Sequence, residues 1–187
     1  MLRTVARLQV ASGYRWPVLR MRTKPRQFFG MTKRRDTTYS MRPIGTVHSP
    51  FTDRSEIPMG RGAKHEAEGT LEVRRDLEAG LTDIEGFSHL YVIWVFHKAD
   101  RSELVGTPPT DDRPHGVFAT RAPYRPNPIG LTVVRLLGRE GNRLRVRGLD
   151  MLDGTPILDI KPFLTNVPEA ELRRGWLGEA EKRGYRV

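Results

Sequence analysis

"FSHLYVIWVFHKA", residues 87–99, is the stretch that decides the fold, because it forms the clearest β-strand of the chain. Successive side chains of a strand point to opposite faces. One face carries Phe87, Tyr91, Ile93 and Val95, and the other carries Leu90, Val92, Trp94 and Phe96. Because both faces are apolar, we expect the strand to be covered on both sides. A barrel wall that also lies in a subunit interface would be covered in this way.

Further strands surround this segment. A short helical turn is predicted at 77–81, and residues 129–152 form a predicted hairpin that turns at "REGN". The remaining predicted strands are 42–49, 69–75, 115–121 and 155–164. About six strands with short links indicate an antiparallel barrel rather than alternating strands and helices. The predicted fold class is all-β, a single antiparallel β-barrel with short helices and a C-terminal helix.

The C-terminal segment, 166–187, is predicted to be helical. Asn166 and Glu169 have the spacing of a capping box, and Pro168 lies in the first turn. Gly175 and Gly178 weaken the middle of this helix. The predicted organisation is therefore an N-terminal extension at 1–40, a barrel domain at 41–165 and a helical extension at 166–187.

The charge of the chain is concentrated in the N-terminal extension. Residues 1–40 hold ten of the 32 Lys and Arg but one of the 22 Asp and Glu, so they carry +9 of the net charge of +10. Three interpretations are open: a basic arm that binds nucleic acid, a transit peptide, or a true start at Met31 or Met41. A cytoplasmic location is expected, or an organellar one if the extension is a transit peptide.

Several kinds of chemistry are excluded or left without support. The chain has no Cys, which excludes disulfides and thiolate metal sites. No apolar run approaches the ~18–20 residues of a membrane-spanning helix. G-x-G-x-x-G, Walker A, G-x-S-x-G and H-E-x-x-H motifs are missing, and the five His are scattered. We therefore expect no membrane span, metal site or Rossmann-type cofactor fold.

Two kinds of segment are candidates for binding a ligand. Glycines in "MGRGAK" (59–64), "NPIGLT" (127–132) and "RGLDMLDGTP" (147–156) permit close backbone approach. The alternatives are a surface loop for "MGRGAK" and an ordinary turn between strands for "LDGTP". In "YRPNPIG", Arg125 and Asn127 each precede a proline, so the loop is held extended. Such a loop either presents Arg121, Arg125 and Asn127 to a ligand or forms a rigid barrel corner.

Other side chains also have two interpretations. Arg143, Arg145 and Arg147 share one strand face, which is either a phosphate-binding stripe or a solvated surface. His97 ends the central strand as a functional or a buried structural residue. Asp150 and Asp153 either bind a ligand or stabilise a turn.

In this order, "IGTVHSPF", "GFSHLYVIWVFHKA", "GVFATRAPYRPNPIGLTVVRL" and "LDMLDGTPILDIKPF" resemble the TsaA-like (TrmO) family over about residues 42–164. The resemblance implies one β-barrel that binds S-adenosylmethionine, with the pocket shared across a homodimer interface. It also implies methylation of N6 of threonylcarbamoyladenosine, next to the tRNA anticodon. The chain resembles a minimal form without the further C-terminal domain that helps the fuller bacterial members to bind tRNA.

The resemblance also implies site residues. The implied cofactor contacts are Arg61, Gly62, Ala63, His97, Lys98, Arg121, Leu131, Arg147, Gly148, Leu149 and Asp150. Alternation points the Arg147 side chain outward, so its contact is expected to run through the main chain. His97 and Asp150 are the candidates for accepting a proton, and Arg125, Asn127, Arg143 and Arg145 for contacting RNA. The alternatives are a methyltransferase of the same barrel with a small-molecule or other RNA acceptor, and a barrel that binds without catalysis.

Overall fold

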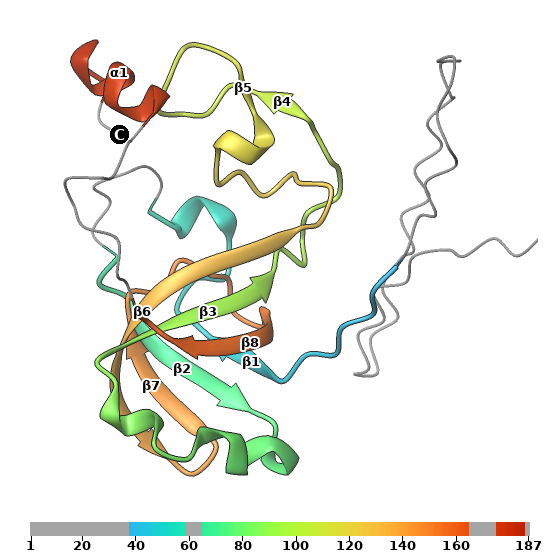
Figure 1. Ribbon diagram of the computed structural model, residues 1–187, viewed down its shortest axis with the longest axis vertical. Helices are drawn as coiled ribbons and strands as arrows, with labels where there is room; N and C mark the ends of the chain where they lie inside the picture. The colour runs from blue at the N-terminus through green and yellow to red at the C-terminus, as the bar shows by residue number, and fades with distance from the viewer. Residues whose placement is uncertain (1–37, 59–64, 165–174, 186–187) are drawn as a thin grey trace, which may run out of the picture. The chain divides into compact units, whose positions relative to one another are not determined.

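A computed structural model describes residues 38–58, 65–164 and 175–185 (Figure 1). The chain divides into two units, Met1–Pro43 and Ile44–Val187, and every helix and strand described lies in the second. The predicted N-terminal extension falls almost entirely outside the described residues, so all three interpretations of it stay open.

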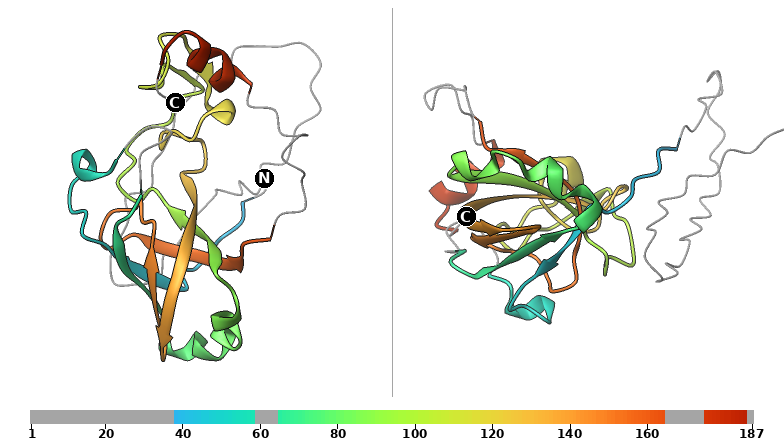
Figure 2. Two further views of the ribbon diagram at one scale, coloured as in Figure 1. Left: turned by 90° about the vertical axis from the view of Figure 1, so that its left-hand side faces the viewer. Right: turned by 90° about the horizontal axis from the view of Figure 1, so that it is seen from below.

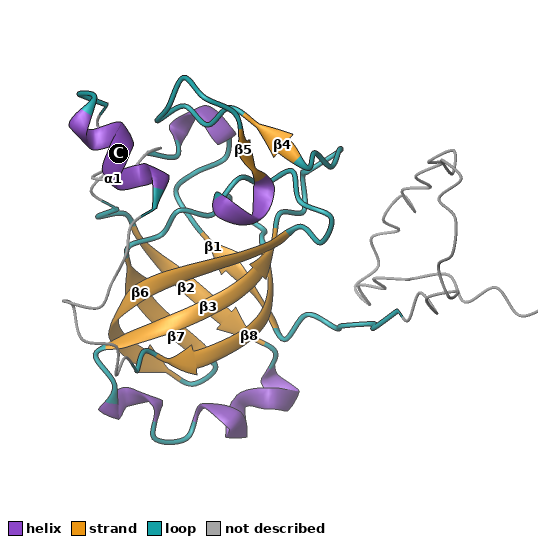
Figure 3. Cartoon of the chain, turned by 45° about the horizontal axis from the view of Figure 1, so that its top comes forward, coloured by secondary structure: helices purple, strands orange, loops and turns teal. Residues whose placement is uncertain are grey.

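Six strands close into a barrel in the order β1–β2–β7–β6–β3–β8, and every neighbouring pair is antiparallel (Figures 1 and 3). The strands are β1 (Gly45–His48), β2 (Glu68–Val73), β3 (His89–Val95), β6 (Ile129–Glu140), β7 (Arg143–Arg147) and β8 (Pro156–Pro162). The predicted all-β antiparallel barrel is confirmed, as is the hairpin that turns between β6 and β7.

Alternation along the strands fills the barrel with apolar side chains. On β3, Leu90 and Val92 are fully buried and Trp94 is nearly so, while Tyr91 and Ile93 on the outer face are only half-buried. The other strands and the loop after β7 add Val47, Leu71, Val134, Leu144, Val146, Leu149, Met151 and Ile157 to this core. Within one chain, therefore, only the inner face of β3 is fully covered.

Short elements lie at both ends of the barrel (Figure 3). At one end are η2 (Arg75–Leu81), which confirms the predicted helical turn, and η3 (Ile84–Gly86). Leu81 packs into the core, and Arg139 Nη1 donates to its carbonyl oxygen at 2.9 Å. The opposite end carries η1 (Arg54–Glu56), β4 (Val105–Gly106), β5 (His115–Gly116), η4 (Val117–Ala119) and α1 (Trp176–Lys182). Within the described residues, this second end combines loops from many parts of the chain.

Two local predictions need correction. The strand predicted at 115–121 is only the two-residue β5, because the N–H and the hydroxyl of Thr120 both bond the Val117 carbonyl and close the turn of η4. The C-terminal helix begins directly after Gly175, whose φ of 53° suits glycine. That glycine therefore precedes the helix instead of weakening its middle. The predicted cap at Asn166 and Glu169 lies outside the described residues.

The helix α1 packs on the loop that contains β5 (Figure 2). Trp176 stacks on His115 with ring centroids 3.9 Å apart, and its Nε1 donates to the Ala119 carbonyl at 2.9 Å. Arg183 bonds the buried Asp111 at 2.5 Å, and His115 bonds it at 3.0 Å. Burial alone would raise the pKa of Asp111, but the hydrogen bonds from Arg183, His115 and Asp112 outweigh burial and hold that pKa well below its usual range. The C-terminal helix thus fixes the loop that leads into the proline segment.

Gly130 on β6 lies opposite Trp94 on β3, and the Trp94 ring occupies the space that a side chain would need. A Cβ atom at Gly130 would lie 2.2 Å from Cε2 of Trp94, far inside van der Waals contact. The position of the tryptophan therefore depends on a glycine across the strand pair.

We expect Gly130→Ala to destabilise the protein by about 1–3 kcal/mol, because the added methyl group overpacks the core against Trp94. Urea unfolding followed by tryptophan fluorescence measures this loss. Gly138→Ala is the matched control on the same strand: nothing lies within 4 Å of its added Cβ, so its stability should change by less than about 0.5 kcal/mol. Equal losses for both variants would contradict the packing argument.

Candidate functional site

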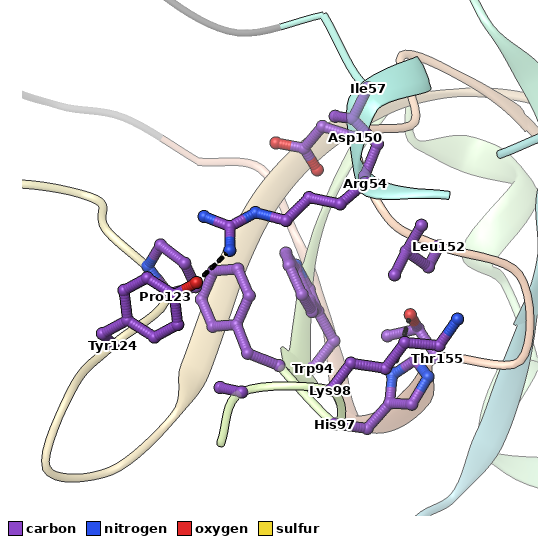
Figure 4. Close-up of a pocket in the computed structure, with 12 residues that line it drawn as sticks. Arg54, Ile57, Trp94, His97, Lys98, Pro123, Tyr124, Asp150, Leu152 and Thr155 are labelled. Atoms are coloured by element: carbon purple, nitrogen blue, oxygen red, sulfur yellow. Dashed lines mark hydrogen bonds between the residues drawn. The ribbon is translucent and has the colours of Figure 1, made fainter. Parts of the chain in front are cut away.

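A pocket of about 90 Å³ lies at the loop-rich end of the barrel (Figure 4). Side chains from four parts of the chain line it. These are Arg54 and Ile57; Trp94, Phe96, His97, Lys98 and Ala99; Pro123 and Tyr124; and Asp150, Leu152 and Thr155. Pockets that enclose a whole small ligand measure roughly 300–1,000 Å³, so these residues alone enclose only part of one.

Asp150 is held at the pocket by two successive hydrogen bonds, the first buried and the second half-buried. Trp94 Nε1 donates to Thr132 Oγ1 at 3.0 Å, and that hydroxyl donates to Asp150 Oδ1 at 2.5 Å. Trp94 and Thr132 are each only 5% exposed. Because both residues point inward from neighbouring strands, the barrel wall itself orients the carboxylate.

His97 lies where β3 ends, with its Nδ1 3.4 Å from Thr155 Oγ1. Burial, and after it the positive charge of Lys98, hold the pKa of His97 below its ordinary value of about 6.5. The imidazole is therefore neutral at pH 7 and has the charge state of a proton acceptor. His97, Lys98 and Asp150 are the predicted cofactor residues that the structure brings together in this pocket.

The proline loop is held by arginines that bond the backbone. Arg125 Nη1 donates to the carbonyls of Val117, Thr120 and Ala122 at 3.1, 2.8 and 3.4 Å. Arg121 donates to the carbonyl of Leu131. The bonds of Arg125 therefore support the interpretation of this loop as a rigid barrel corner. RNA contacts of Arg125 and of the exposed Asn127 stay predictions.

Arg121 and Leu131, predicted as cofactor contacts, do not line this pocket. Leu131 is 50% exposed on the outer face of β6, because the inward positions on either side of it are Gly130 and Thr132. Leu131 therefore does not line this pocket within a single chain, and its cofactor contact stays a prediction. Arg61, Gly62 and Ala63 lie outside the described residues.

The turn after β7 differs in part from expectation. Gly148 has φ 101°, and the N–H groups of Gly148 and Leu149 both bond the Ala67 carbonyl, at 3.0 and 3.2 Å. The Leu149 side chain is fully buried in the core. A cofactor contact at these two residues would thus have to use their carbonyl groups.

The basic face of β7 is largely neutralised. The three arginines share the outward face, as predicted, and Leu144 and Val146 point inward. Arg147 pairs with Glu68 at 2.5 Å and Arg143 with Glu72 at 3.4 Å. Arg145 faces Thr70 and has no ion pair within the described residues, so it is the cation of this face best able to meet a phosphate.

Two features are absent from the residues that the structure describes. Among them, no helix combines the length and apolar character that crossing a membrane requires. No group of three or more His, Cys, Asp or Glu in the described ranges is arranged to hold a metal ion.

A closed six-stranded barrel with a partly aromatic pocket at its loop end defines a small ligand-binding β-barrel. Residues 46–168 match the tRNA-methyltransferase O N-terminal domain family, and the chain belongs to that family. This agrees with the family resemblance of the sequence motifs.

Individual relatives support the same assignment. A probable S-adenosyl-L-methionine-binding protein of Pyrococcus abyssi is 51% identical over 73% of this chain and 74% of its own length. The mouse tRNA (adenine(37)-N6)-methyltransferase is 37% identical over 66% of this chain and 30% of its own. A crystal structure of TrmO from Pseudomonas aeruginosa superposes with a TM-score of 0.61 at 39% identity, covering 74% of this chain and 62% of that one. The chain thus spans less than two thirds of the length of the TrmO and mouse proteins.

The sequence analysis does not identify several of the residues that line the pocket. Trp94 and Phe96 were assigned only to faces of a strand, although their rings lie 4.3 Å apart at the pocket. Tyr124 lies in the proline segment "YRPNPIG", and an aromatic residue between prolines is the sequence feature that could have identified it as a site residue. Arg54 lies in a long polar connection where no pattern marks it.

We expect His97 to titrate below pH 6.5 in an NMR titration of the imidazole, because burial and Lys98 disfavour its charged form. Lys98→Gln should raise the pKa of His97 only in part, because burial, the larger cause, remains. Lys161→Gln, at the far end of β8, is the control and should leave the His97 titration unchanged. A pKa at or above 6.5 in the wild type would contradict the burial argument.

Proposed function

We propose that this chain is an S-adenosylmethionine-dependent methyltransferase that methylates N6 of threonylcarbamoyladenosine next to the tRNA anticodon. The observation that carries the proposal is the convergence of neutral His97 and oriented Asp150 on one partly aromatic pocket. The names of the relatives support both the cofactor and the acceptor class.

The pocket residues fit such a cofactor. Aromatic and aliphatic side chains pack against an adenine ring or a thioether chain, and Asp150 and Thr155 bond hydroxyl or amine groups. The cofactor supplies a methyl group on a positively charged sulfur. A carboxylate and electron-rich aromatic faces stabilise such a cation. Arg121, Leu131, Arg147, Gly148 and Leu149, and Arg61–Ala63, remain proposed contacts beyond this pocket.

The protein residues contribute mainly position and proton transfer. Transfer in line requires the acceptor nitrogen to lie directly behind the methyl group, and the rigid pocket walls favour that arrangement. N6 would gain the methyl group as the sulfur–methyl bond breaks and a neutral thioether leaves, and N6 would lose a proton. We assign that proton to the neutral His97 imidazole or to Asp150, whose Thr132 hydrogen bond leaves a second carboxylate oxygen to act.

The RNA is proposed to approach the loop-rich end and the face of β7. Arg145 and Asn127 are exposed there. Arg125 and Arg143 are also proposed to contact RNA, through guanidinium N–H groups that do not bond the protein. Phosphate contacts of this kind make binding salt-dependent.

We also propose a homodimer through the outer face of β3, β6 and β8. Tyr91 pairs with Val133 and Ile93 with Leu131, and Phe163 packs 5.0 Å from Tyr91. Leu131, Val133 and Phe163 are 50, 40 and 36% exposed. An exposed apolar sheet face of this kind is typical of an interface. A second copy there would bring the outward Leu131 into a shared site.

The decisive test uses cofactor with a labelled methyl group and tRNA from cells that do, or do not, make threonylcarbamoyladenosine. We expect label only in the first tRNA. His97→Gln should lower the transfer rate about 10²–10⁴-fold if His97 takes the proton. His48→Gln, which alters an exposed histidine on β1 that does not line the pocket, should retain wild-type rates.

Other outcomes would overturn the proposal in distinct ways. Equal labelling of both tRNAs would point to another RNA acceptor. Labelling of neither, with cofactor bound, would favour a small-molecule acceptor or a barrel that binds without catalysis.

For the dimer, we expect light scattering to give the wild-type protein twice the mass of one chain. Leu131→Asp should yield monomers, because it places a charge in the apolar contact. Val105→Asp, which alters a similarly exposed apolar residue away from this face, should remain dimeric. A monomeric wild-type protein would exclude the shared site.

A further inference from the structure

Among the described arginines, Arg54 is the one that lines the pocket. Six arginines of the second unit have their charge matched by acids, namely Arg74, Arg101, Arg139, Arg143, Arg147 and Arg183. Arg54 lines the pocket and has no ion pair within the described residues. A guanidinium without an acidic partner at a pocket is suited to an anionic ligand.

Tyr124 holds this guanidinium in place. Arg54 Nη1 donates to the Tyr124 hydroxyl, and the Arg54 Cζ lies 4.9 Å from the ring centroid (Figure 4). Because the phenol oxygen accepts this bond, its own proton remains available for donation. Tyr124 and Arg54 therefore offer an O–H and several N–H donors side by side.

The ring itself is fixed from other directions. Arg101 stacks on Tyr124 with its Cζ 3.7 Å from the centroid, and Glu103 both pairs with Arg101 and donates its N–H to the Tyr124 carbonyl at 3.1 Å. Pro123 and Pro126 stiffen the chain around it. The donors are thus preorganised, which lowers the entropic cost of binding.

We propose that Arg54 and Tyr124 form a carboxylate-binding site at the pocket. A guanidinium and a phenol O–H together match the two oxygens of a carboxylate. The inference rests on the proposed function, in which two ligands carry that group: the methionine part of the cofactor and the threonyl part of the modified base. The shared chemistry is the carboxylate, and the experiment separates its two sources.

The test measures binding to two pairs of ligands that differ in one carboxylate-bearing group. Calorimetry compares S-adenosylmethionine with its decarboxylated form, and fluorescence anisotropy compares tRNA with and without threonylcarbamoyladenosine. In one of the two pairs, we expect Arg54→Gln to weaken binding of the ligand that has the carboxylate about tenfold or more. The affinity for the ligand of that pair without the carboxylate should change by less than about twofold. Tyr124→Phe should weaken the same ligand by a smaller factor, and the affected pair identifies the source.

Arg74→Gln is the charge control, because it removes a positive charge at the opposite end of the barrel and should change neither pair. If Arg54→Gln weakens the binding of both ligands of a pair equally, the cause is a general effect of charge or an RNA phosphate contact. That result would overturn the carboxylate site. So would a wild-type protein that does not discriminate within either pair. A wild-type protein that discriminates but transfers no methyl group would instead overturn the proposed function alone.

Discussion

The packing of Trp94 over Gly130 is the contact on which the candidate site depends. Alternation along β3 turns the tryptophan inward at the loop-rich end, and only a glycine on β6 leaves room for its ring. The indole N–H then reaches Thr132, two residues along β6, and Thr132 holds Asp150 after β7. One close contact between two strands thereby orients a carboxylate from a third part of the chain.

The fold follows from patterns that act over short distances, which is why the sequence predicts it well. Two-residue alternation separates Leu90 and Val92 from Tyr91 and Ile93, and the polar "REGN" turn fixes the hairpin register. The same pattern wrongly predicts a strand at Val117–Thr120, because a hydrogen bond from Thr120 closes a turn inside a segment whose sequence resembles a strand. Periodicity cannot register such a competing side-chain bond.

The site is less predictable, because its residues meet through the closure of the barrel. His97 and Asp150 were expected from family motifs, but Arg54 is brought to Tyr124 across 70 positions of sequence. Motifs also do not say which way a side chain points. Leu131 belongs to a predicted site segment, yet its side chain lies on the outer face of the barrel. Arg125 uses its Nη1 to bond three carbonyl groups of its own loop.

Charge pairing separates structural arginines from those available to ligands. The basic face of β7 looks like a binding stripe in sequence, but Glu68 and Glu72 on β2 neutralise its two ends. An exposed ion pair adds little stability, yet it occupies the donors that a phosphate would need. Net charge is therefore a poor guide to this barrel domain. A cation without an acidic partner keeps its charge available to an anion. Among the described arginines of this kind, Arg54 is the one that lines the pocket, and it lies beside a hydroxyl that orients it.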